Sequence, residues 1–146
     1  MAYAENRKAR FDYEILEKYE TGIELLGTEV KSVRGGRMSL EGSFAIIRGG
    51  EAFLINSNIP PYQPANVPSD YDPLRNRKLL LTKKEASELV GSEKNKSLTI
   101  VPISVYNEGK KIKVEIALVK GKKKHDKRES IKKRETNREI RRSLKI

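Results

Sequence analysis

A period-two alternation of apolar and acidic residues is the first pattern along the chain. Phe11, Tyr13 and Ile15 are separated by Asp12 and Glu14. Successive side chains of a β-strand point to opposite faces, so this spacing is typical of a strand with one buried face. The alternation therefore predicts an early strand over Phe11–Ile15.

Two apolar runs in the middle of the chain flank a pair of glycines. The runs are Ser43–Arg48 and Glu51–Asn56, and Gly49-Gly50 lies between them. A Gly-Gly pair supplies the positive φ values that a tight hairpin turn requires. These residues predict a β-hairpin.

A second hairpin is predicted nearer the C-terminus. Thr99–Val105 is an apolar run that reaches a turn around Asn107–Gly109, and Ile112–Leu118 returns from it. Pro102 has no backbone N–H to donate to a neighbouring strand. Its strand is therefore expected to be an edge at that point or to carry a bulge.

Two short segments contain residues that are typical of the first and last positions of helices. In "TKKEASELVG", Thr82 and Glu85 have the spacing of a capping box, and Gly91 is predicted to end the helix. In "GTEVKSVRGG", Thr28 is predicted to cap a shorter helix that Gly35-Gly36 ends.

The rest of the pattern favours a barrel. Five of the six prolines lie between Asn58 and Pro73, which predicts an extended loop without regular structure and a candidate contact surface. The order strand, helix, hairpin, loop, helix, hairpin predicts a mainly β fold. We expect an OB-like antiparallel β-barrel with two to three short accessory helices. Such barrels often bind oligonucleotides, although a fold alone is weak support for a function.

Composition limits the possible chemistry. The 146 residues include no cysteine and one histidine, so a zinc site would have to rest on carboxylates alone. No G-x-x-x-x-G-K-[ST] or G-x-G-x-x-G motif occurs. The sequence thus predicts a protein that is not an enzyme and has no metal and no cofactor. It has neither a signal-peptide h-region nor an apolar run near spanning length, which predicts a soluble cytoplasmic protein.

The net charge of +11 is concentrated at the C-terminus. Met1–Val119 contains 18 Lys and Arg against 16 Asp and Glu, a net +2, whereas Lys120–Ile146 contains 13 against 4, a net +9. Such a segment attracts polyanions because it releases their counterions. Nucleic acid is the favoured partner; an anionic membrane and a merely solubilising tail are the alternatives.

Basic residues also cluster in the body of the chain. Each cluster alone is common on protein surfaces, but each is a candidate for phosphate contact. The clusters are Arg7, Lys8 and Arg10; Arg75, Arg77 and Lys78; and Lys110, Lys111 and Lys113.

The basic tail has helix signals but no docking face. Asp126 and Glu129 have capping-box spacing. Ile131 and Ile140 fall on roughly opposite sides of a helix, so no apolar stripe would hold that helix on the barrel. The tail is therefore predicted to be disordered when free and helical when a polyanion neutralises it. His125, surrounded by cations, is a candidate for stacking on a base.

Several stretches together resemble the SsrA-binding protein family, also called small protein B. The resemblance covers essentially the whole chain. It is found in "NRKARFDYEI", "YETGIELLGTEVKSVR", "GSFAIIRGGEAFLINSNIPPY", "DPLRNRKLLL" and "KGKKKHDKRESIKKRE". It implies a non-enzymatic partner of transfer-messenger RNA (tmRNA) in the rescue of stalled ribosomes.

The resemblance also implies a division of labour. A barrel over residues 1–121 would bind the transfer-RNA-like domain of tmRNA, with family positions at Glu20, Leu80 and Lys113. Asn6 and Arg7 would join the same surface. With the basic clusters, the predicted tmRNA-binding set is Asn6, Arg7, Lys8, Arg10, Glu20, Arg75, Lys78, Leu80 and Lys113.

By the same resemblance, residues 122–146 would enter the small ribosomal subunit. They would meet ribosomal RNA at the decoding centre and continue as a helix along the empty messenger channel. The protein is expected to act as a monomer without a membrane partner. The rival interpretation is a ribosomal or ribosome-assembly protein that binds naked ribosomal RNA. The predicted tail set is Lys123, Lys124, His125, Asp126, Lys127, Arg128, Lys132, Lys133 and Arg134.

Overall fold

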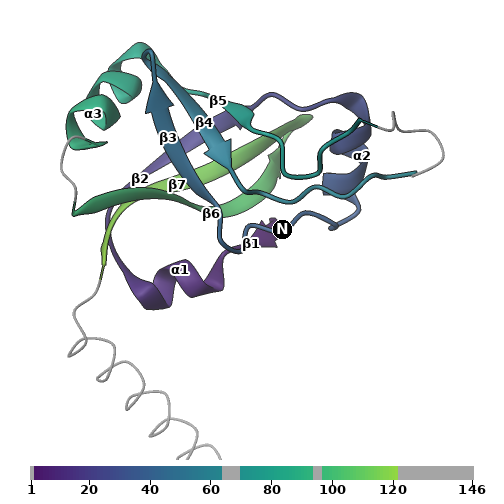
Figure 1. Ribbon diagram of the computed structural model, residues 1–146, viewed down its shortest axis with the longest axis horizontal. Coiled ribbons are helices and arrows are strands. Elements are labelled where there is room, and N and C mark those ends of the chain that lie inside the picture. Colours follow the sequence, from purple (N-terminus) through teal and green to yellow (C-terminus); the bar gives the residue numbers. More distant parts are fainter. Residues whose placement is uncertain (1, 64–69, 94–96, 122–146) are drawn as a thin grey trace, which may run out of the picture.

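The structure is a computed structural model that describes residues 2–63, 70–93 and 97–121 (Figure 1). Within these ranges the chain forms strands and three short helices. In chain order they are β1 (Ala2–Glu5), α1 (Arg7–Asp12), β2 (Tyr13–Ile23), α2 (Gly27–Arg34), β3 (Phe44–Arg48), β4 (Glu51–Ile55), β5 (Arg77–Leu80), α3 (Lys83–Glu93), β6 (Leu98–Glu108) and β7 (Lys111–Gly121).

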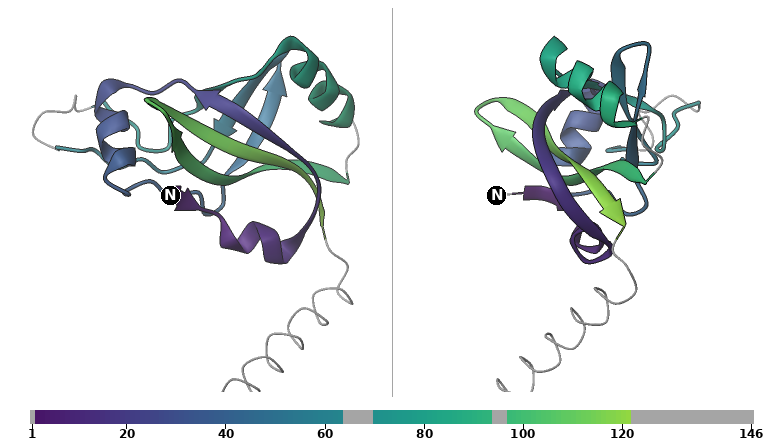
Figure 2. Two further views of the ribbon diagram at one scale, coloured as in Figure 1. Left: turned by 180° about the vertical axis from the view of Figure 1, so that it is seen from behind. Right: turned by 90° about the vertical axis from the view of Figure 1, so that its left-hand side faces the viewer.

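Six antiparallel strands close into a ring. The order is β6-β3-β4-β5-β2-β7, and pairing of β7 with β6 completes the circle. Figures 1 and 2 show β2, β6 and β7 curving around one side, with α3 and α2 near the ends. β1 pairs with β6 outside the ring. The predicted mainly β, antiparallel architecture with short helices is confirmed.

The β3–β4 hairpin is confirmed where the sequence predicted it. Arg48 pairs with Glu51, and the two residues between them form the turn. Gly49 and Gly50 have φ values of 59° and 77°, in the left-handed region where a residue with a Cβ is strained. The Gly-Gly pair is therefore required by the turn itself.

The second hairpin, β6–β7, is longer than predicted. Glu108 pairs with Lys111, so the turn is at Gly109-Lys110 and the strands extend past both predicted ends. At Pro102 the register shifts between Pro102 and Ser104, which is the predicted bulge. On the side away from β7, β6 pairs with β3 at Ile100 and with β1 from Ser104 to Tyr106, so Pro102 lies between these two pairings.

The capping box of α3 is confirmed, but its predicted end is wrong. Thr82 Oγ1 accepts a hydrogen bond from the Glu85 N–H at 3.2 Å, and the Thr82 N–H donates to Glu85 Oε1 at 3.2 Å. The helix passes Gly91 and ends at Glu93. Gly91 does not have a positive φ, so nothing in its backbone stops the helix.

For α2, the predicted end is confirmed and the predicted cap is wrong. Gly35 is the C-cap residue, and its N–H donates to the Lys31 carbonyl at 3.1 Å. The N-cap position is Leu26 rather than Thr28. Glu29 takes the capping role, because its Oε1 accepts from the Leu26 N–H at 2.8 Å.

The early strand begins two residues later than predicted. Phe11 and Asp12 belong to α1, and β2 starts at Tyr13. Asn6 caps α1 by accepting from the Ala9 N–H at 3.3 Å, and Ala9 is buried in a cluster with apolar residues of β6 and β7. Because these contacts hold α1 in place, Phe11 lies in the helix, and the alternation of apolar and acidic residues forms a strand only from Tyr13 to Ile15.

The interior of the ring is apolar. Alternate residues of the strands face inward, and the side chains of Leu54, Val105, Val114 and Ile116 are fully buried. A smaller cluster beneath α1 contains Ala9, Val101, Ile103, Ala117 and Val119. Away from α1, the outer face of β2 and β7 carries polar and charged residues, among them Lys18, Glu20, Lys113 and Glu115.

The proline-rich connection has no helix or strand in its described parts, 58–63 and 70–73, as predicted. An isolated bridge between Ser39 and Asn58 is its one sheet-like contact among the described residues. Within the described residues, none of the helices has the length and apolar character needed to cross a membrane, and no cluster of His, Asp and Glu is arranged to hold a metal ion.

Candidate nucleic-acid interface

A row of side chains crosses the outer face of the barrel at Gly22. Leu80 of β5 is paired with Gly22 of β2, and Gly22 is paired on its other side with Lys113 of β7. Lys113 is paired in turn with Tyr106 of β6. Directly paired residues of antiparallel strands share a face. Leu80, Gly22, Lys113 and Tyr106 therefore form one continuous row, which we call the Gly22 row.

Glu20 borders this row on the same face, because it precedes Gly22 by two residues in β2. The Tyr106 hydroxyl donates to Glu20 Oε2 at 2.5 Å. That hydrogen bond lowers the pKa of Glu20, and the charge of Lys113 acts in the same direction. A hydrogen bond with Glu20 raises the pKa of Glu108. Glu20 is therefore held as the ionised acceptor beside the Lys113 cation.

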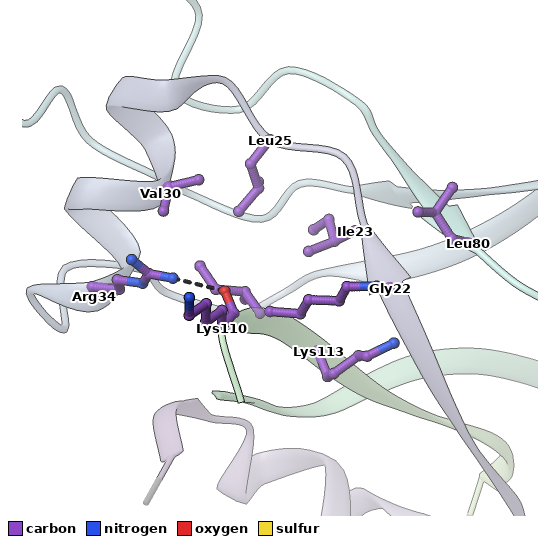
Figure 3. Close-up of a pocket in the computed structure, with 10 residues that line it drawn as sticks. Gly22, Ile23, Leu25, Val30, Arg34, Leu80, Lys110 and Lys113 are labelled. Carbon is purple, nitrogen blue, oxygen red and sulfur yellow. Dashed lines mark hydrogen bonds between the residues drawn. The ribbon is translucent and has the colours of Figure 1, made fainter. Parts of the chain in front are cut away.

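A groove of about 360 Å³ opens beside the Gly22 row (Figure 3). It lies between the end of β2, α2 and the tip of the β6–β7 hairpin, and we call it the Lys113 groove. Its floor is apolar and its rim is cationic. The apolar side chains are those of Ile23, Leu25, Val30, Leu80 and Ile112, and the cations are Arg34, Lys110, Lys111 and Lys113.

Two side chains shape this groove. Arg34 is bound to the hairpin, since its Nη2 donates to the Lys110 carbonyl at 2.9 Å (Figure 3). Leu80 remains 47% exposed although it is a large apolar side chain on a strand. Phosphate can meet the lysines while a base meets the apolar floor, which is the combination that single-stranded nucleic acid needs.

Arg77 is not available for the phosphate contact that the sequence predicted. Its side chain is fully buried, and its guanidinium donates to Glu29, to the Ser57, Arg75 and Pro73 carbonyls, and to the Ser57 and Tyr71 hydroxyls. All of its N–H groups therefore bind within the protein. It is a structural arginine that joins β5 to the proline-rich connection.

Glu29 is the anion at the centre of this buried network, and the sequence analysis missed it. Burial alone would raise its pKa, but hydrogen bonds from Arg75, the Leu26 backbone and Arg77 outweigh that effect and lower the pKa. Arg77 Nε is 2.7 Å from Glu29 Oε2, and Arg75 binds both carboxylate oxygens. No pattern in the sequence around Glu29 indicates this role, because its partners Arg75 and Arg77 lie more than forty positions later in the chain.

Acid is expected to destabilise the protein through Glu29. The pKa of Glu29 is lower in the folded than in the unfolded state, so its ionised carboxylate stabilises the fold at pH values above the unfolded-state pKa of about 4.3. This stabilisation is lost as the pH falls through the folded-state pKa. Urea unfolding from about pH 7 to pH 3 should show this decline. The Glu29→Gln variant, which cannot ionise, should be less stable at neutral pH and should show a flatter decline. Parallel curves for the two proteins would contradict the assignment.

Arg75 and Lys78 line a different groove of about 730 Å³. The segment from Ile23 to Leu26 separates it from the Lys113 groove, and Phe53 contributes an aromatic wall. Both cations have partners: Arg75 binds Glu29, and Lys78 Nζ is 3.0 Å from Glu51 Oε1. The structure does not bring these two residues into the Lys113 groove.

The N-terminal cluster lies apart from both grooves, around α1. Asn6 is buried, and its amide is already used by the Pro102 carbonyl at 3.0 Å and the Ala9 N–H. Arg7 and Lys8 are exposed, and Arg7 Nε is 3.8 Å from Glu5 Oε2. Figures 1 and 2 show α1 well away from α2. The predicted tail set, from Lys123 to Arg134, lies outside the described residues.

A closed antiparallel barrel with a cationic, apolar-floored groove on its outer face has the architecture of a small barrel suited to a polyanionic ligand. The chain belongs to the SmpB family, whose model, described as "SmpB protein", matches residues 3–146. The resemblance found in the sequence is thereby confirmed. Membership in this family of RNA-binding proteins also confirms the prediction that the protein is not an enzyme.

Relatives match the chain over nearly its full length. An SsrA-binding protein of Thermosynechococcus vestitus is 51% identical over 97% of this chain and 93% of its own length. That of Enterococcus faecalis is 52% identical over 97% of this chain and 92% of its own. A solved structure described as "tmRNA-SmpB: a journey to the center of the bacterial ribosome" matches with a TM-score of 0.68 and 47% identity, covering 87% of this chain and 92% of that one.

Proposed function

We propose that this protein binds the transfer-RNA-like domain of tmRNA and delivers it to stalled ribosomes for trans-translation. Family membership supports this function, because the relatives are SsrA-binding proteins and the matching solved structure concerns tmRNA and SmpB at the bacterial ribosome. The partners are thus tmRNA and the ribosome, and the protein acts in the cytoplasm as a monomer.

The observation that carries the proposal is the meeting of three residues from distant parts of the chain. Glu20, Leu80 and Lys113, which the resemblance assigned to RNA binding, surround Gly22 on one outer face. Three different strands supply them. We assign this face, in an OB-like barrel spanning residues 1–121, as the principal tmRNA-binding surface.

Each residue has a physical role at this surface. Lys113 binds a phosphate as a point charge, and Leu80 packs against a base or ribose. Glu20 accepts hydrogen bonds, and the hydrogen bond from the Tyr106 hydroxyl, which lowers the pKa of Glu20, further favours the ionised carboxylate. Flanking contacts with the RNA come from four basic residues outside the Lys113 groove: Arg7, Lys8, Arg75 and Lys78. The buried Asn6 supports this surface by capping α1, the helix that carries Arg7, Lys8 and Arg10.

The tail is assigned to the ribosome. Residues 122–146 carry most of the net charge of +11, which favours ribosomal RNA on the walls of the empty messenger channel. At the decoding centre, His125 stacks on a base while Lys127 and Arg128 bind phosphates. Asp126 begins a helix that forms on RNA and runs along the channel, with the tail's other basic residues facing phosphate.

The test is a competition gel shift at fixed, moderate salt between a transfer-RNA-like RNA and duplex DNA. The protein should prefer the RNA. Lys113→Ala should weaken RNA binding by roughly tenfold and reduce the salt slope by about one. Lys84→Ala, which removes an exposed cation of α3, is the matched control and should leave binding unchanged.

Two results would contradict the proposal. Equal affinity for duplex DNA would indicate a general DNA binder. Tighter binding to naked ribosomal RNA than to the transfer-RNA-like RNA would favour the rival interpretation as a ribosomal or assembly protein.

A further inference from the structure

The exposed side of α2 and the turn that follows it carry a group of cations. Lys31, Arg34 and Arg37 are all exposed, and none of the three forms an ion pair within the described residues. By contrast, Arg75 and Lys78 are each paired with a glutamate. Basic residues in the last turn of a helix complement its dipole, which accounts for Lys31 and Arg34 without any ligand. The charges alone therefore do not indicate a binding site.

An aromatic ring among these cations is a second, independent observation. Tyr62 is 40% exposed, and Lys31 Nζ lies 5.9 Å from the centroid of its ring. Complementing a helix dipole does not involve an aromatic ring. Proteins that bind single-stranded nucleic acid combine exposed rings, on which bases stack, with cations that bind the phosphates. We call Lys31, Arg34, Arg37 and Tyr62 the α2 face.

Hydrogen bonds to the proline-rich connection hold the Tyr62 ring in place. Ser32 Oγ of α2 donates to the Pro60 carbonyl at 2.7 Å. Arg37 Nη1 donates to the carbonyls of Pro61 and Tyr62 at 3.3 and 3.2 Å. The two prolines also restrict the backbone, because their rings fix φ. Tyr62 is thus presented along α2 with little conformational freedom left to lose on binding.

The α2 face is continuous with the Lys113 groove but lies mostly outside it. Arg34 belongs to both, since it lines the groove and its Nη2 donates to the Lys110 carbonyl at 2.9 Å (Figure 3). Lys31 is three positions before Arg34, so the two residues share one side of the helix. An RNA strand that leaves the groove past Arg34 therefore meets Lys31 and then the Tyr62 ring.

We propose that the α2 face binds a single-stranded nucleotide of tmRNA outside the Lys113 groove. The base stacks on the Tyr62 ring, and Lys31 and Arg37 bind the adjoining phosphates. This inference rests on the function proposed above and adds a second contact surface to it. Every base has a face that can stack, so this contact contributes affinity with little preference for one base.

The first experiment measures stacking directly. The chain contains no tryptophan, so the indole of a full-length Tyr62→Trp variant can be followed by itself. Its fluorescence should be quenched when the transfer-RNA-like RNA saturates the protein, because a base lies against the ring. Lys84→Trp, on α3 at the opposite end of the barrel, is the matched control and should keep its fluorescence (Figure 1). Equal fluorescence of the free and RNA-bound Tyr62→Trp protein would overturn the inference.

The second experiment measures affinity. Tyr62→Ala should weaken binding to the transfer-RNA-like RNA by roughly tenfold, whereas Tyr62→Phe, which keeps the ring, should bind as the wild type does. Thermal unfolding should show that both variants are folded. Wild-type affinity in a folded Tyr62→Ala protein would overturn the inference, even if tagging on ribosomes were reduced. A Tyr62→Phe protein as weak as Tyr62→Ala would show that the hydroxyl acts rather than the ring, and would overturn stacking.

The phosphate contact is tested by the salt dependence of the same binding. Lys31→Ala should reduce the salt slope by about one, and Lys84→Ala should leave the slope unchanged. An unchanged slope for Lys31→Ala would overturn the phosphate contact at α2. A wild-type protein that does not prefer the transfer-RNA-like RNA to duplex DNA would instead overturn the proposed function, so the two failures are distinguishable.

Discussion

Replacing Glu29 with alanine is expected to reduce the free energy of unfolding by about 3–5 kcal/mol. The substitution leaves Arg77 fully buried without its anion and removes both carboxylate contacts of Arg75. An uncompensated buried charge is among the most destabilising changes in a protein core. The helix also loses the carboxylate that caps it at the Leu26 N–H. Urea unfolding at neutral pH measures the difference.

The control for this variant is Glu41→Ala, which removes an exposed carboxylate from the turn before β3. It should change the free energy of unfolding by no more than about 0.5 kcal/mol. A Glu29→Ala protein as stable as Glu41→Ala would show that the two arginines do not depend on Glu29. The proline-rich connection would then need another anchor to α2 and β5.

Ending the chain after Gly121 is expected to abolish tagging on stalled ribosomes while leaving affinity for the isolated transfer-RNA-like RNA within about threefold. The Gly22 row and the Lys113 groove lie wholly before this point. The removed segment carries most of the positive charge, which we assign to ribosomal RNA. Tagging is measured in a reconstituted translation system, and RNA affinity by gel shift at moderate salt.

Because the removed segment is so basic, non-specific binding must be controlled. Duplex DNA binding should fall more than binding to the transfer-RNA-like RNA, since the DNA contact depends on charge alone. Loss of high-affinity RNA binding in the shortened protein would contradict the division between barrel and tail. Normal tagging by that protein would do so equally.

Local chemistry predicted much of the fold. The Gly49-Gly50 turn and the Thr82–Glu85 capping box each depend on residues only a few positions apart, and both were found where expected. The error at the start of β2 arose because a distant contact decided the outcome. Asn6, bound to the Pro102 carbonyl on β6, anchors α1 and draws Phe11 into it.

The candidate site was predicted unevenly for the same reason. Arg75 and Arg77 look alike in sequence, yet burial beneath the proline-rich connection makes Arg77 structural. Glu29 showed no sign of its role, because its partners Arg75 and Arg77 follow it by more than forty positions. The basic character of residues 110–113 was visible directly.

The sequence by itself determined the hairpins, the capped helix, the concentration of charge at the C-terminus and the family. Each of these depends on local order or on composition, which the chain carries before it folds. Only the tertiary structure decided that Leu80, Gly22 and Lys113 share one row, with Glu20 beside it. Closing the ring places β2 between β5 and β7, and the register of those two pairings determines which residues meet.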